Sequence, residues 1–180
     1  MQFLEKIKKS IFSLIILSLL IISFFVFKFA LQKEKNYSPK ITENQINTNF
    51  EVSDLMEEKK INFDQILLGK NFYLINIWSS WCEPCKDESD QLLELKNDTL
   101  IMMIGINYKD KKKNALNFLK LYGNPFDKIF IDKQGTISIN FGAYGVPETF
   151  LINDNNKVLK KYIGPLNDEN VYEIKKIISN

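Results

Sequence analysis

The longest apolar stretch of the 180-residue chain lies close to its N-terminus. Residues 11–27, IFSLIILSLLIISFFVF, contain no charged residue, and the stretch continues beyond Lys28 to Leu31. About 20 apolar residues are enough to cross a bilayer as a helix, and no polar face interrupts this run. The pattern predicts a transmembrane anchor over residues 11–31, preceded by a short segment of residues 1–10.

A cleaved signal peptide is the alternative to an anchor. Its apolar region would be shorter and would end in small residues of the A-x-A type, whereas residues 27–35 read FKFALQKEK and contain one alanine. We therefore favour an uncleaved anchor. The lysines around the span leave its orientation open, because three precede it and three follow it within a few residues.

A polar segment separates the anchor from the rest of the chain. Residues 32–49, QKEKNYSPKITENQINTN, have no apolar period, which is typical of a linker. Apolar residues make up 45% of the chain, enough to build a core. We predict one globular domain over residues 50–180, without an internal repeat.

Within residues 50–180 the apolar pattern alternates between strands and helices. Strands are predicted at 71–78, 99–108, 128–132, 148–154 and 157–164, and helices from the cysteines toward Lys96, at 112–123 and at 168–179. Gly123 is the expected end of the second helix, and Asn167 or Asp168 the expected cap of the third. Strands that alternate with helices predict a parallel part of the sheet, and the last two strands add an antiparallel hairpin. The fold class is therefore α/β, a mixed central sheet flanked by helices.

Composition removes several classes of function. The formal net charge is +2, so nothing points to nucleic acid as a partner. The chain has no histidine, which excludes Cys–His and Ser–His–Asp nucleophiles and histidine ligands to metal or haem. All basic residues are lysines, and the lysine-rich run at residues 109–114 is interpreted as a solvated helix start.

The only two cysteines lie in WSSWCEPC, residues 78–85, directly after a predicted buried strand and at the start of a helix. Two cysteines supply half of the ligands of a tetrahedral zinc site. Lys86 follows Cys85, so the C-x-x-C-H pattern of haem attachment is not met. We expect no metal and no cofactor, with zinc shared between two chains as the open alternative.

The position of Cys82 favours redox chemistry. A helix N-terminus stabilises the thiolate that acts as nucleophile, and Pro84 suits the first helical turn, where its missing N–H costs nothing. Glu83 should raise the pKa of Cys82, and Lys86 should partly offset this effect. Cys85 lies close enough to close a disulfide, and a purely structural disulfide is the weaker reading because so small a loop constrains the unfolded chain little.

Several segments carry a resemblance to known proteins. WSSWCEPC resembles the W-C-x-x-C of thioredoxin-like proteins, and GVPETF (145–150) resembles their cis-proline segment. The segments GINYKD (105–110), LKLYGNPF (119–126), FGAYGVPETFLIND (141–154) and YIGPLN (162–167) resemble the CcmG family, also called DsbE. The resemblance covers roughly residues 46–180, and the single N-terminal anchor agrees with it.

The resemblance implies a thioredoxin-like fold over residues 50–180 that faces the periplasm, with residues 1–10 in the cytoplasm and the anchor in the inner membrane. It implies a protein disulfide reductase that acts on apocytochrome c, or on a CcmH-like thiol protein, before haem attachment. Electrons would come from a membrane donor of the CcdA or DsbD kind. A local reductant is needed there because the periplasm oxidises cysteine pairs. A monomer is expected.

The resemblance also implies residue roles. Cys82 would be the attacking thiolate and Cys85 the resolving thiol, and Trp81 would shape the docking surface. Val146 and Pro147 would share a cis peptide bond opposite the disulfide, with the Val146 backbone offering hydrogen bonds to an extended peptide. An ordinary strand-edge proline is the alternative for Pro147.

One carboxylate is a candidate for proton handling. Thioredoxin has a buried aspartate in the strand before its cysteines, and the matching residue here is Asn76, which cannot take a proton from Cys85. We hypothesise that Glu148, directly after Pro147, helps to manage protons during exchange. A solvated residue at the start of a strand is the alternative for Glu148.

Four other functions stay open. On the same fold, the chain could be a TlpA- or ResA-like reductase with another client, or a peroxidase. An oxidant that inserts disulfides is a third, although Glu83 beside Cys82 argues against a strongly stabilised thiolate. A non-catalytic module that holds apocytochrome c in the groove is the fourth, and replacing both cysteines with serine would leave its function intact.

Overall fold

The computed structural model describes residues 2–32, 46, 48–57 and 59–179, and the chain divides into two compact units, residues 1–40 and 41–180. In the first unit, α1 (Gln2–Gln32) is a helix of 31 residues. Its segment Ser10–Phe29 is long and apolar enough to cross a membrane, properties that a signal sequence shares. Most of the predicted linker lies outside the described residues.

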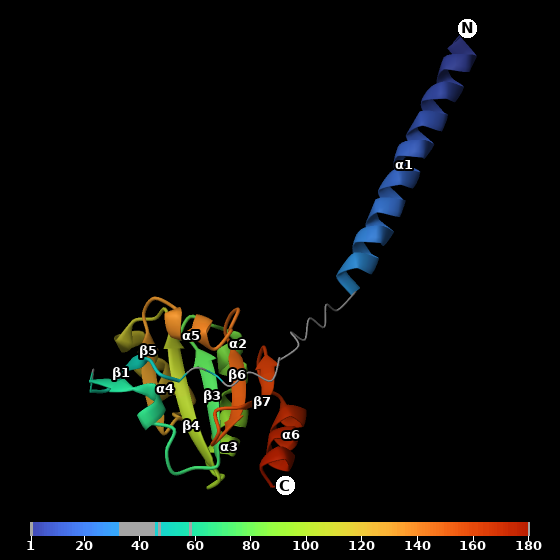
Figure 1. Cartoon of the computed structure of the whole chain (residues 1–180). Helices are drawn as coiled ribbons and strands as arrows, with labels where there is room; N and C mark the ends of the chain where they lie inside the picture. The colour runs from blue at the N-terminus through green and yellow to red at the C-terminus, as the bar shows by residue number, and fades with distance from the viewer. Residues whose placement is uncertain (1, 33–45, 47, 58, 180) are drawn as a thin grey trace. The chain divides into compact units, whose positions relative to one another are not determined.

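The second unit is built on a seven-stranded sheet in the order β2-β1-β5-β4-β3-β6-β7 (Figure 1). The strands are β1 (Glu51–Asp54), β2 (Lys60–Asn62), β3 (Phe72–Trp78), β4 (Ile101–Tyr108), β5 (Lys128–Asp132), β6 (Glu148–Asn153) and β7 (Val158–Ile163). The pairs β3–β4 and β4–β5 are parallel, and the other four pairs are antiparallel. The predicted mixed sheet with its C-terminal hairpin is confirmed.

Helices cover both faces of this sheet (Figure 1). They are η1 (Phe63–Gln65), α2 (Pro84–Asp87), α3 (Ser89–Lys96), α4 (Lys112–Tyr122), α5 (Thr136–Asn140) and α6 (Asp168–Ile178). Side chains alternate along β3: Leu74 and Trp78 join one buried cluster with α3, α4 and α6, whereas Tyr73, Ile75 and Ile77 join another with η1 and α5. The cysteines belong to the first cluster.

Helix ends follow the sequence signals. Gly123 ends α4 with φ of 89°, a conformation that glycine adopts without steric cost. Asn167 caps α6: its side chain accepts from the N–H of Asn170, and the Asn170 side chain accepts from the N–H of Asn167. The helix predicted after the cysteines is divided in two at Glu88, which lies between α2 and α3 with ψ near 0°.

The sequence pattern missed only short elements among those described. β1 and β2 have four and three residues, η1 has three and α5 has five. None is long enough to display a period. β1 and β2 form through pairing with other strands, as when Ser53 of β1 aligns with Ile131 of β5.

Candidate active site

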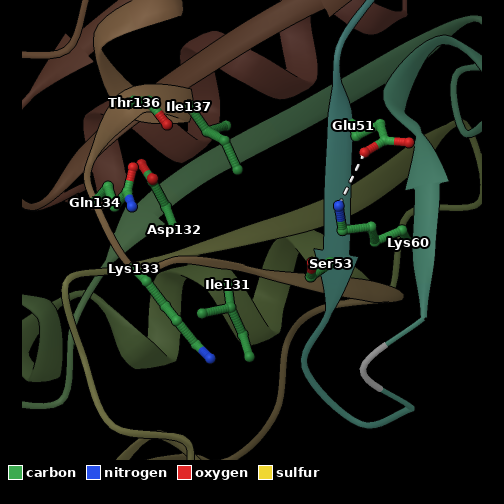
Figure 2. A pocket seen from close by; sticks show the side chains of 9 residues that line it. All are labelled: Glu51, Ser53, Lys60, Ile131, Asp132, Lys133, Gln134, Thr136 and Ile137. Carbon is green, nitrogen blue, oxygen red and sulfur yellow. Dashed lines mark hydrogen bonds and ion pairs between the residues drawn. The ribbon is translucent and has the colours of Figure 1, made fainter.

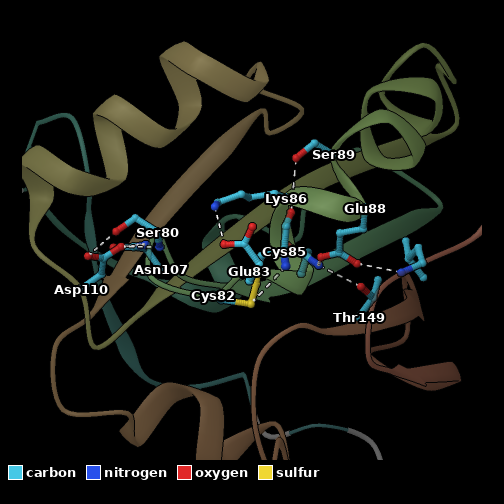
Figure 3. Close-up of a disulfide and its surroundings, with 12 residues drawn as sticks. Ser80, Cys82, Glu83, Cys85, Lys86, Glu88, Ser89, Asn107, Asp110 and Thr149 are labelled. Carbon is cyan, nitrogen blue, oxygen red and sulfur yellow. Dashed lines mark hydrogen bonds and ion pairs between the residues drawn. A yellow bond between two sulfur atoms is a disulfide. The ribbon is translucent and has the colours of Figure 1, made fainter.

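A disulfide joins Cys82 and Cys85 shortly after the interior strand β3 (Figure 3). The two Cα atoms are 5.3 Å apart, and both residues are buried, with exposed fractions of 4% and 2%. Pro84 occupies the first turn of α2, and the N–H of Cys85 donates to Cys82 Sγ at 3.2 Å. As expected from the sequence, a helix N–H group therefore points at the sulfur of Cys82.

Charges beside the disulfide are paired on the surface. Glu83 is largely exposed, and its carboxylate forms an ion pair with Lys86. The hydrogen bond from Lys86 and the negative charge of Glu83 raise the pKa of the lysine above its usual value. Glu83 therefore faces a cation, as expected, which weakens its effect on the Cys82 thiol.

The turn between β3 and the disulfide is held by a carboxylate on the next loop. Asp110 accepts hydrogen bonds from the Ser80 N–H at 2.7 Å and the Ser80 hydroxyl at 2.9 Å. It also accepts from the Asn107 amide (Figure 3) and from the N–H of Lys111. Burial alone would raise the pKa of Asp110, but these hydrogen bonds outweigh it and lower the pKa. Asp110 lies in the GINYKD segment but was not among the residues predicted to form the site.

The two tryptophans differ in exposure. Trp78 is 1% exposed and packs against Phe118 and Phe126 in the core. Trp81 is 59% exposed, and its indole N–H donates to the carbonyl of Lys109 at 3.2 Å. Trp81 is thus available at the surface beside Cys82, and its docking role stays a prediction.

Glu88, three residues after Cys85, is a fully buried carboxylate. One oxygen accepts from the Asn76 amide at 2.9 Å, and the other accepts from the N–H of Leu166 at 2.9 Å. The same Asn76 amide donates to Thr149 Oγ1 at 2.9 Å. Burial raises the pKa of Glu88 to about 7, and the two hydrogen bonds limit the rise. Its proton can therefore exchange near neutral pH.

Glu88 was not among the residues predicted from the sequence. The usable signal was spacing: Cys85 and Glu88 are three residues apart, and such residues lie on the same side of a helix. Asn76 cannot itself take a proton from Cys85, but its amide donates to the Glu88 carboxylate and orients it.

The peptide bond between Val146 and Pro147 is cis, as predicted. In the pairing of β3 with β6, Glu148 lies opposite Ile77, which is close to the cysteine end of β3. Pro147 directly precedes Glu148 and therefore lies near that end of the sheet. Val146 is half-buried and packs against the cluster that contains both cysteines. Its role in binding an extended peptide stays a prediction.

Glu148 is 1% exposed, so the interpretation as a solvated residue is wrong. One carboxylate oxygen accepts from the N–H groups of Tyr144 at 2.6 Å and Gly145 at 2.9 Å. The other forms an ion pair with Lys161 at 2.8 Å. These partners hold the loop before Pro147; the proposed role of Glu148 in proton handling stays a prediction.

A separate cleft of about 420 Å³ lies between the β1–β2 edge and the segment from β5 to α5 (Figure 2). Its lining includes the ion-paired Glu51 and Lys60 and the buried Asp132. Neither cysteine and no residue of the cis-proline segment contributes to it. The candidate site therefore rests on the disulfide and its neighbours.

Comparisons with known proteins agree with this geometry. The family model described as Redoxin matches residues 34–178. Thiol:disulfide interchange protein CycY of Rhizobium leguminosarum bv. viciae is 43% identical over 102 residues, 57% of this chain and 54% of the relative. Thiol:disulfide interchange protein DsbE of Vibrio cholerae is 36% identical over 124 residues, 69% of this chain and 66% of the relative. The chain thus spans less than two thirds of the length of either relative.

Solved structures show the same fold. A putative thiol:disulfide interchange protein DsbE from Chlorobium tepidum has a TM-score of 0.63 at 20% identity and covers 76% of this chain and 95% of its own. A thioredoxin-like protein from Aeropyrum pernix has a TM-score of 0.61 at 16% identity, covering 73% and 89%. With its thioredoxin-like fold and a match over residues 34–178, the chain belongs to the Redoxin family.

Proposed function

We propose that the protein is a membrane-anchored thiol:disulfide oxidoreductase that works as a reductant. The observation that carries this proposal is the Cys82–Cys85 disulfide at the start of α2, with the Cys85 N–H directed at Cys82 Sγ. Donation from a backbone N–H stabilises a sulfur anion. The names of the relatives, thiol:disulfide interchange proteins, support the same chemistry.

Cys82 is the nucleophile in this proposal. The exposed fractions of the two cysteines differ too little to assign the role, but the N–H bond favours a thiolate at Cys82. In the reduced protein, Cys82 thiolate attacks a client disulfide, forming one mixed disulfide and releasing one client thiolate. Cys85 thiolate then attacks Cys82 Sγ, which releases the second client thiolate and forms the observed disulfide. Two electrons pass to the client, and each client thiolate takes up one proton.

Glu88 is suited to accept the proton of the Cys85 thiol. The Cys85 thiol must lose its proton before the second attack, and a buried carboxylate with a pKa of about 7 can accept it. Asn76 and the Leu166 N–H hold both oxygens in place. Glu148 is the weaker candidate for this step, because its two oxygens are occupied by Lys161 and by the N–H groups of Tyr144 and Gly145.

The proposed client is apocytochrome c, or a CcmH-like thiol protein, before haem attachment. The segments that resemble the CcmG family support this client and a membrane donor of the CcdA or DsbD kind, which returns two electrons to the disulfide. The helix α1 supports a single-pass inner-membrane anchor, with the domain of residues 50–180 in the periplasm. The periplasm is oxidising and converts cysteine pairs to disulfides, whereas haem attachment needs free thiols.

The first test is the reduction potential of the Cys82–Cys85 pair in the full chain, in detergent micelles. We expect a value well below that of the oxidant DsbA, which is about −120 mV, and nearer that of thioredoxin, about −270 mV. A potential at or above that of DsbA would mean an oxidant and would overturn the proposed direction. Replacing both cysteines with serine should abolish exchange; retained support of cytochrome c maturation by this variant would instead indicate a binding module.

The client is tested separately. Oxidised peptides with the haem-binding sequence C-x-x-C-H should be reduced faster than a disulfide peptide of the same composition without that motif. Equal rates would favour a reductase with a different client, of the TlpA or ResA kind. Consumption of hydrogen peroxide at a comparable rate would indicate a peroxidase.

A further inference from the structure

Lys161 on β7 has a buried side chain and was not among the residues predicted from the sequence. Its side chain is 7% exposed, and it forms the ion pair with Glu148 at 2.8 Å. The ammonium also donates to the carbonyl of Gly142 at 2.8 Å. It lies over two aromatic rings, 4.5 Å from the centroid of Tyr144 and 5.1 Å from that of Phe150.

These contacts enclose the loop of residues 142–146, which directly precedes Pro147. Lys161 holds the beginning of the loop through the Gly142 carbonyl. Through Glu148 it also holds the middle, because Glu148 accepts from the N–H groups of Tyr144 and Gly145. One ammonium group thus organises a segment that has no regular secondary structure of its own.

The loop presents groups that suit the capture of a peptide. Tyr144 is 72% exposed, although its ring lies over the buried ammonium. Val146 follows two residues later and packs against the cysteine cluster. A cation beneath an aromatic ring fixes the ring without covering its outer face, so Tyr144 can offer that face to an apolar side chain.

We propose that Lys161 is a positioning residue for client binding: it sets the loop of residues 142–146 so that Tyr144 and the Val146 backbone receive an extended, disulfide-bearing peptide. The inference rests on the proposed function, because it assigns the docking side of the same site. Lys161 does not touch the sulfur atoms in any contact described above, so its effect falls on binding and leaves the sulfur chemistry unaltered.

The test compares Lys161→Met with Lys160→Met in the full chain, in detergent micelles. Lys160 is the matched control, because it lies next to Lys161 on β7 but is 42% exposed and pairs with Glu173 of α6. For an oxidised C-x-x-C-H peptide, Lys161→Met should raise KM about tenfold with kcat within about twofold, as expected when uniform binding is lost. Exchange with dithiothreitol, which needs no docking loop, should stay within about twofold of the native rate.

Amide hydrogen exchange gives a readout that does not depend on activity. The N–H groups of Tyr144 and Gly145 should lose protection in Lys161→Met, keep it in Lys160→Met, and regain most of it in Lys161→Arg, which restores a cation. If the native protein exchanges no disulfides, the proposed function fails while this measurement still tests the loop. Unchanged protection together with unchanged KM in Lys161→Met would overturn the inference.

A double variant controls for the misfolding of Lys161→Met. Lys161→Met leaves the buried Glu148 without its cation, a change that can unfold a protein, whereas removing both charges of a buried pair is often tolerated. The double variant Lys161→Met/Glu148→Gln should therefore fold and still show the raised KM and the loss of amide protection. A double variant that binds the peptide as the native protein does would overturn the role of Lys161.

Discussion

Two buried carboxylates of the domain, Glu88 and Glu148, differ in their partners. Glu88, between α2 and α3, accepts hydrogen bonds from the Asn76 amide and the Leu166 N–H, both neutral groups. Glu148, at the start of β6, faces the Lys161 ammonium. Both side chains are almost completely removed from solvent, with exposed fractions of 0% and 1%.

The difference shows that burial alone does not decide what a carboxylate does. Without a cation, burial raises the pKa of Glu88 to about 7, so its proton can move during exchange. With a cation, the charge of Glu148 is compensated and is used to hold two backbone N–H groups. Glu88 is therefore suited to proton transfer, and Glu148 is suited to hold the loop of residues 142–146 in shape.

The largest effect is expected from removing the compensated carboxylate. Glu148→Ala leaves the buried Lys161 ammonium without its carboxylate partner and deprives two N–H groups of their acceptor. We expect the free energy of unfolding to fall by about 3–5 kcal/mol, measured by urea denaturation of the full chain in micelles. Glu94→Ala, which removes the exposed partner of Lys175, is the control and should cost less than about 1 kcal/mol. Equal losses in both variants would contradict the comparison.

The next effect is a pH dependence that Glu88 should produce. The pKa of Glu88 is about 7 in the folded protein and 4.5 for an ordinary, solvated glutamate, so the folded state binds the proton more tightly than the unfolded state. The free energy of unfolding of the oxidised protein should therefore fall as pH rises from 4.5 to about 7, by on the order of 3 kcal/mol. Glu88→Gln should remove this slope when denaturation is followed at pH 5 and pH 8. A slope that persists in the variant would show that another group produces it.

A third carboxylate should show the opposite dependence on pH. Hydrogen bonds from Ser80 and Asn107 lower the pKa of Asp110, so its contribution to stability is present above the usual pKa and is lost as pH falls through the folded value. Asp110→Asn should cost about 1–3 kcal/mol at pH 7 by disturbing hydrogen bonds to Ser80. The emission of the exposed Trp81 should change in the same variant. A spectrum and stability equal to those of the native protein would argue against this anchoring of the turn.

The smallest effect is expected from the exposed carboxylate beside the disulfide. Glu83 is paired with Lys86 at the surface, so Glu83→Gln should change the free energy of unfolding by less than about 1 kcal/mol. In the reduced protein the pKa of Cys82 should fall, by less than about one unit, because a negative charge is removed. The rate of alkylation by iodoacetamide as a function of pH measures this pKa. A large fall would mean that Lys86 does not offset Glu83.

Much of the fold followed from local patterns. The strands β3, β5 and β6 begin and end within one residue of their predicted bounds, because continuous runs of apolar residues mark strands buried on both faces. The predicted α6 and its Asn167 cap are also observed, since capping depends on neighbouring residues. β1, β2 and α5 were missed, because elements this short depend on contacts with distant segments for their stability.

By itself, the sequence determined the apolar span, the alternation of strands and helices, and the cysteine pair at a helix start, since each depends on residues that are close along the chain. Only the tertiary structure decided which groups face each buried carboxylate, and hence that the pKa of Glu88 is raised. Asn76 and Leu166 are 12 and 78 residues from Glu88, and Lys161 reaches Glu148 across the β6–β7 pair. The pKa of a carboxylate depends on burial and on the charges within a few ångströms, and folding alone brings those groups together.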